Sequence, residues 1–104
     1  MTDEITETMY LKTYRVNGEV LVAACDCEII GKTFEEGALF IEVASDFFGD
    51  EKASFEEFEA ALKDATMANM MGEKTVTCAI DLELVNDESV LRIDGIPCAQ
   101  MVRM

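Results

Sequence analysis

The sequence predicts an α+β fold, in which two helices are grouped on a mostly antiparallel sheet. Strand-like runs flank an Asn-Gly dipeptide near the N-terminus, a capping signal precedes a helical periodicity in mid-chain, and a second strand-turn-strand pattern lies near the C-terminus. The sheet is expected to contain the N-terminal hairpin, a third strand and the C-terminal strands. Since 104 residues suffice for one core, we expect a single domain over residues 9–104, preceded by a flexible acidic extension over residues 1–8.

The first element is a β-hairpin. Residues 9–16 and 19–25 are strand-like, and Asn17-Gly18 between them is the dipeptide best able to adopt the two positive φ values of a type I′ turn. A two-residue turn pairs Val16 with Glu19, and both faces of the hairpin are then apolar enough to be covered. One face carries Tyr10, Tyr14, Val16, Leu21, Ala23 and Cys25, and the other carries Leu11, Val20, Val22 and Ala24.

A short helical turn and the third strand follow. Asp26 is expected to cap one turn over residues 27–30, which Gly31 ends in the left-handed conformation. Leu39, Ile41 and Val43 alternate with Phe40 and Glu42, a pattern that predicts a strand.

Two helices are predicted next. Ser54 and Glu57 form a capping box, and apolar residues recur at helical spacing over residues 55–68, so one long helix is expected to run until Gly72. Its end carries the methionines Met67, Met70 and Met71. A second helix is predicted over about residues 74–85, although its Thr-Val-Thr segment would also tolerate a strand.

The C-terminus repeats the strand-turn-strand pattern. Residues 90–93 and 96–102 are strand-like, and Asp94-Gly95 lies between them. Pro97 cannot donate a backbone hydrogen bond, so it belongs at an edge or at the start of its strand.

Charge limits the classes of partner. The net charge is −14, from 22 acidic and 8 basic residues, and residues 35–64 hold ten acids against two lysines. Such a surface repels phosphate backbones and anionic lipid, so we do not expect direct binding to nucleic acid or to a membrane. We expect a basic protein as the partner. Without an export signal or an apolar run longer than six residues, the chain is expected to be cytoplasmic with reduced cysteines.

No catalytic motif is present, and no cofactor is expected. The sequence has no His, which removes the commonest general base and every imidazole metal ligand. Gly31-Lys32-Thr33 lacks the preceding glycine of a phosphate-binding loop, and residues 46–57 lack the ligands of a calcium loop. The cysteines could form a four-thiolate zinc site, but with a single close pair the spacing favours buried thiols. These are Cys25, Cys27, Cys78 and Cys98.

Three stretches carry a resemblance to a known family. They are residues 25–37 (CDCEIIGKTFEEG), 68–73 (ANMMGE) and 90–100 (VLRIDGIPCAQ). In order and spacing they resemble an archaeal family of small uncharacterised proteins, domain of unknown function 424. The resemblance implies a single-domain archaeal cytosolic protein with no assigned activity. It also implies that His stands in the family where this chain has Cys98, so that Cys25 and Cys98 could replace a Cys and His pair around a metal or a ligand.

Two functions remain open from the sequence. The first is a non-catalytic binding or accessory protein that presents its acidic surface to a basic protein, for instance in the translation machinery. The second is a small enzyme or ligand binder with a pocket near the polar residues of the three stretches, which are Cys25, Asn69, Arg92 and Gln100. Oligomeric state is left open.

Overall fold

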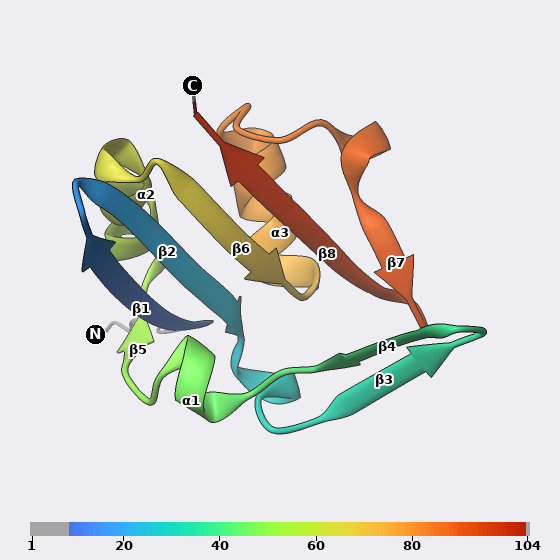
Figure 1. Ribbon diagram of the computed structural model, residues 1–104. Coiled ribbons are helices and arrows are strands. Elements are labelled where there is room, and N and C mark those ends of the chain that lie inside the picture. Colours follow the sequence, from blue (N-terminus) through green and yellow to red (C-terminus); the bar gives the residue numbers. More distant parts are fainter. Residues whose placement is uncertain (1–8, 104) are drawn as a thin grey trace, which may run out of the picture.

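A six-stranded sheet forms the centre of the computed structural model, which describes residues 9–103 (Figure 1). Its strands lie in the order β5-β1-β2-β6-β8-β7, and every neighbouring pair is antiparallel except β2 and β6. The mostly antiparallel α+β fold is therefore confirmed. The strands are β1 (Met9–Val16), β2 (Glu19–Asp26), β5 (Lys52–Ala53), β6 (Met67–Met71), β7 (Leu91–Ile93) and β8 (Ile96–Val102). The predicted extension over residues 1–8 lies outside the described residues.

Both predicted hairpins are present. Val16 pairs with Glu19 in the N-terminal hairpin, and Asn17 and Gly18 have φ values of 52° and 82°, as a type I′ turn requires. Asp94 and Gly95 take similar values, 54° and 81°, between β7 and β8. Pro97 is the second residue of β8, so it lies at the start of its strand, as predicted, although β8 is not an edge of the sheet.

Two helices cover one face of the sheet. They are α2 (Phe55–Asp64) and α3 (Glu73–Asp81), which lie behind the sheet in Figure 1. Their apolar sides pack on the buried side chains of β1, β2, β6 and β8, and each fully buried Phe or Leu contributes about 1.5–3 kcal/mol. The core on this face includes Met9, Val22, Ala24, Phe58, Leu62, Met70 and Val76. No helix within residues 9–103 is long and apolar enough to cross a membrane.

The other face is covered only in part, by an arm that extends over residues 33–48. The arm contains β3 (Thr33–Glu36), β4 (Leu39–Glu42) and the short helix α1 (Ser45–Phe48). The predicted third strand thus forms, but it pairs with β3 in a separate two-stranded sheet. The chain closes this hairpin locally, since Gly31 N–H donates to Val43 O and Val43 N–H donates to Lys32 O.

The prediction of one long helix that runs until Gly72 is wrong in its second half. Helix α2 ends at Asp64, where the Arg103 guanidinium donates to the carbonyls of Leu62, Lys63 and Ala65. Residues 67–71 form β6, which hydrogen-bonds to β2 on one side and to β8 on the other. These ladder bonds between distant segments override the local helical preference of Ala and Met. The second helix is correct in type but ends at Asp81 rather than near residue 85.

Candidate functional site

The arm and the partly covered face of the sheet enclose a groove of about 680 Å³. Its floor is made by β6, β7 and β8, and its wall by β4 and α1. This volume is in the range of natural ligand sites, about 300–1,000 Å³. The floor residues used below are Asn69, Met71, Leu91, Ile93, Cys98 and Gln100, and the wall residues are Ile41, Glu42, Phe47 and Phe48.

Tyr14 holds the wall in place. Its hydroxyl donates to the carbonyl of Phe47 at 2.6 Å, and the rings of Tyr14 and Phe47 stack with centroids 5.6 Å apart. At the other end of the arm the backbone N–H of Asp94 donates to Glu36 Oε1 at 2.6 Å. The arm is therefore attached at α1 and near its tip, and the groove lies between these attachments.

Asn69 and Gln100 lie side by side on the floor. They are directly opposed in the antiparallel pair β6 and β8, which places their side chains on the same face of the sheet. Asn69 is partly buried and Gln100 is exposed. Within residues 9–103 neither side-chain amide takes part in an internal hydrogen bond. Both amides are thus available to a ligand.

Only two of the four residues predicted to share a pocket line the groove. Cys25 is on the same face but fully buried beneath the arm, in register with Met71. Arg92 lies between Leu91 and Ile93, which face the groove, so strand alternation directs it to the opposite face, where it pairs with Glu73 of α3 at 3.2 Å. The structure therefore brings Asn69 and Gln100 together in the groove and leaves Cys25 and Arg92 outside its lining.

The four cysteines do not gather. Cys25 and Cys98 belong to the core beneath the arm, whereas Cys78 packs on the core under the helices. In residues 9–103 no group of three or more Cys, Asp or Glu side chains is placed to hold a metal ion, so the four-thiolate zinc site is not formed. Burial raises the pKa of Cys25 to about 12, with a contribution from the charge of Asp26, and burial also raises the pKa of Cys98. Both are thiols at neutral pH, which makes them poor nucleophiles.

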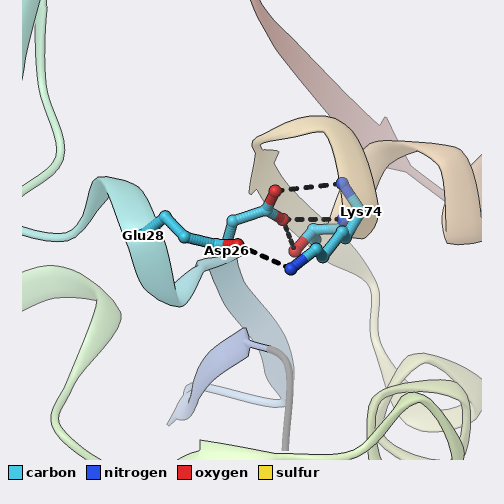
Figure 2. Close-up of polar contacts among 4 residues, drawn as sticks. Asp26, Glu28 and Lys74 are labelled. Carbon is cyan, nitrogen blue, oxygen red and sulfur yellow. Dashed lines mark hydrogen bonds and ion pairs between the residues drawn. The ribbon is translucent and has the colours of Figure 1, made fainter.

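A second polar cluster lies where β2 ends beside α3 (Figure 2). The buried carboxylate of Asp26 accepts hydrogen bonds from the backbone N–H groups of Lys74 and Thr75, at 3.0 and 2.8 Å, and from the Thr75 hydroxyl at 2.8 Å. The side chain of Asp26 therefore caps α3. The predicted short turn does form, as the 3-10 helix η1 (Cys27–Ile29) with Asp26 at its N-cap position, and Gly31 follows it with a φ of 82°. The prediction is wrong only in that the Asp26 side chain makes no capping hydrogen bond to η1. Outside this cap the Lys74 ammonium pairs with Glu28, which raises the pKa of Lys74 and lowers that of Glu28.

This cluster is structural. The helix N-terminus is the part of α3 that would attract an anion, and the protein's own carboxylate already occupies it. Gly72 has a φ of 105°, and a Cβ there would be 2.4 Å from Asp26 Cγ, so only glycine fits beside the cap. The groove is left as the candidate functional site.

Sequence reasoning missed the wall of the groove and part of its floor. Phe47 and Ile41 are ordinary apolar residues in the sequence, and only the folding of the arm over the sheet brings them opposite Leu91. The alternation in residues 39–43 was the one available signal, because it indicates a strand with an apolar side that must face something.

The family described as "Protein of unknown function (DUF424)" matches residues 14–104. The comparison with curated proteins found no match. Among solved structures the chain is similar to an uncharacterized conserved protein from the archaeon Methanopyrus kandleri, with a TM-score of 0.74 at 16% identity over 92% of this chain and 94% of the other. That likeness shows a shared fold, and the family match covers nearly the whole chain. The chain belongs to the DUF424 family of proteins of unknown function.

Proposed function

We propose that this protein is a non-catalytic binding protein that holds a basic segment of a partner protein in the groove. The observation that carries the proposal is the contrast between the floor and the arm. Strands β6 and β8 of the floor contain no charged residue, whereas the arm, residues 33–48, contains four acids and no Lys or Arg. One of these acids, Glu42 of β4, lines the groove.

Apolar contact and charge would act together on such a segment. One aliphatic side chain buried against Phe47 and Leu91 supplies about 1.5–3 kcal/mol. Glu42 at the groove and the other acids of the arm favour Lys or Arg and disfavour acidic segments, and the net charge of −14 accelerates encounter with a basic partner. We place the protein in the cytoplasm and its partner among the basic proteins of ribonucleoprotein assemblies such as those of translation.

The test compares capture by groove variants with capture by a variant of the helix-covered face. Leu91 and Phe55 are both exposed large apolar residues, at 51% and 42%, so either can be changed with little loss of stability. We expect Leu91→Ser, which removes the apolar contact without adding charge, and Glu42→Lys each to reduce capture of a basic partner from native lysate at least tenfold, and Phe55→Ser to leave it unchanged. Crosslinks from the partner to residues 39–47 should accompany capture. Equal capture by all variants, or loss only in Phe55→Ser, would contradict the proposal.

A second candidate is a small-ligand binder or enzyme that uses the same groove, and the groove volume favours it. Of the four residues first considered for this role, Asn69 and Gln100 line the groove, and the raised pKa values of Cys25 and Cys98 disfavour thiol catalysis. Binding is thus the better supported form of this alternative. Saturation-transfer NMR against a library of cell metabolites separates the two candidates, because a small ligand would give a signal without any protein partner and Leu91→Ser would remove that signal.

A further inference from the structure

We infer that the partner segment lies extended in the groove, with its backbone peptide groups hydrogen-bonded to the side-chain amides of Asn69 and Gln100. This inference rests on the proposed function and specifies the conformation and the recognised groups of the ligand.

The two side-chain amides are close enough to bind one ligand together. Directly opposed residues of antiparallel strands have Cβ atoms about 4.5–5.5 Å apart, so Asn69 and Gln100 can both reach one ligand. Each carboxamide offers one carbonyl acceptor and an NH₂ donor, the same combination that a peptide group offers in reverse. The pair can therefore bind the C=O and N–H groups of a neighbouring chain.

The surroundings of the two amides are largely apolar. Asn69 and Gln100 share the groove with Met71, Phe47 and Phe48, so a ligand that fills it excludes water from the amides. Polar groups buried without partners are costly, and the ligand must supply matching donors and acceptors. An apolar side chain alone would leave both amides unpaired, whereas a peptide backbone would satisfy them.

A helical segment or a nucleic acid would fit the groove less well than an extended segment. A helical segment already uses its backbone groups in its own hydrogen bonds and offers none to the floor. An extended segment leaves its backbone groups free and directs successive side chains to opposite sides. One side chain can then contact Leu91 while the next approaches Glu42. A nucleic acid would bring phosphates close to Glu42 and the other acids of the arm, and like-charge repulsion disfavours this.

The experiment uses defined probes and ¹⁵N-labelled protein. The parent probe is the peptide Gly-Lys-Leu-Lys-Val-Lys-Gly, acetylated and amidated at its ends. Its matched analogue has ester bonds in place of the peptide bonds before Leu and Val, which removes two N–H donors without adding bulk. We expect the parent to shift the side-chain NH₂ signals of Asn69 and Gln100, and the ester analogue to bind about five- to tenfold more weakly.

Protein variants provide the second arm of the test. Asn69→Ala and Gln100→Ala should each lower the affinity for the parent peptide by a similar factor. Each should also reduce the difference in affinity between the peptide and its ester analogue. Asn86→Ala is the matched control, because Asn86 is exposed, makes no capping hydrogen bond and does not line the groove. It should bind both probes like the wild type.

The outcomes separate the inference from the proposed function. If the peptide shifts groove signals but the ester and both alanine variants bind as tightly as their parents, backbone recognition is overturned and the basic-segment site stands. If the peptide shifts no groove signal at any soluble concentration, the proposed function fails and the inference with it. Shifts of the same signals by a single-stranded oligonucleotide in place of the peptide would also overturn both.

Discussion

Asp26 joins two distant parts of the chain through one carboxylate. The side chain lies at the end of β2, is 6% exposed, and accepts three hydrogen bonds from Lys74 and Thr75 at the start of α3. Helix α3 has Gly72 at its N-cap, which offers no side chain for capping. The helix therefore depends on a residue 48 positions earlier in the chain for the role that Ser54 performs locally for α2.

A double-mutant cycle at Asp26 and Gly72 tests this arrangement. Asp26→Ala is expected to lower the free energy of unfolding by about 2–3 kcal/mol, because it leaves two N–H groups and the Thr75 hydroxyl unpaired. Gly72→Ala should also destabilise the protein, through its positive φ and its contact with the carboxylate. In urea denaturation the double variant should lose less than the two single losses combined, because removing the carboxylate removes the contact. Additive losses would contradict the close approach between position 72 and the Asp26 carboxylate. Thr75→Ser is the control, because it keeps the hydroxyl, and its free energy of unfolding should stay within about 1 kcal/mol of the wild-type value.

Among elements, β6 departs most from local sequence preference. Residues 67–71 are Met-Ala-Asn-Met-Met, which continue the helical spacing that begins at Phe55. They form a strand because β2 and β8 supply hydrogen bonds on both sides and because Arg103 stabilises the end of α2 at Asp64. The candidate site depends on this outcome, since Asn69 reaches the groove only from a strand.

An isolated peptide of residues 54–72 tests whether the tertiary structure imposes the strand. Removed from β2, β8 and Arg103, the peptide should be helical beyond Asp64, to about Met70, when a helix-promoting alcohol overcomes its short length. Carbon-13 chemical shifts along the peptide measure where the helix ends. A helix that still ends at Asp64 would show that the local sequence determines the end, and a peptide ending at Ala65 serves as the control for the common part.

On the scale of the whole molecule, acidic charge is concentrated in elements that cover the two faces of the sheet. Helix α2 on one face and the arm on the other carry much of the acidic excess, whereas strands β6 and β8 between them are uncharged. Residues 9–103 contain two ion pairs, Lys74 with Glu28 and Arg92 with Glu73, and both are solvent-exposed, so they offset little of the repulsion.

Raising ionic strength should therefore stabilise the protein. Going from 0.01 M to 1 M NaCl shortens the Debye length from about 30 Å to about 3 Å, which screens the repulsion among acidic side chains. The thermal unfolding midpoint is expected to rise, by about 4–8 °C for each ~1 kcal/mol gained. The variant Glu35→Lys/Asp50→Lys should be more stable at low salt and less sensitive to added salt, because both residues are exposed, lie outside the helices and take part in neither of the two ion pairs. A midpoint that falls with salt in the wild type would contradict this expectation.

The sequence by itself determined the features that depend on neighbouring residues. Asn17-Gly18 and Asp94-Gly95 fix two tight turns through their backbone conformations, and the two-residue turn at Asn17-Gly18 sets the register of the N-terminal hairpin. Ser54 and Glu57 fix the start of α2 by mutual hydrogen bonds. Polar residues in apolar surroundings also identified Asn69 and Gln100 as candidates, and both line the groove.

Only the tertiary structure decided what depends on distant partners. Residues 67–71 become a strand because they pair with β2, which lies far earlier in the chain, and with β8, which lies far later. Asp26 caps a helix that begins long after it. The predicted third strand pairs with β3 in its own hairpin and not with the main sheet. Arg92 is excluded from the groove by the pleat of a three-residue strand, whose register is set by β8. The groove exists because the arm packs over part of one sheet face. No local pattern encodes this contact, because the arm and the strands of the floor are far apart in the chain.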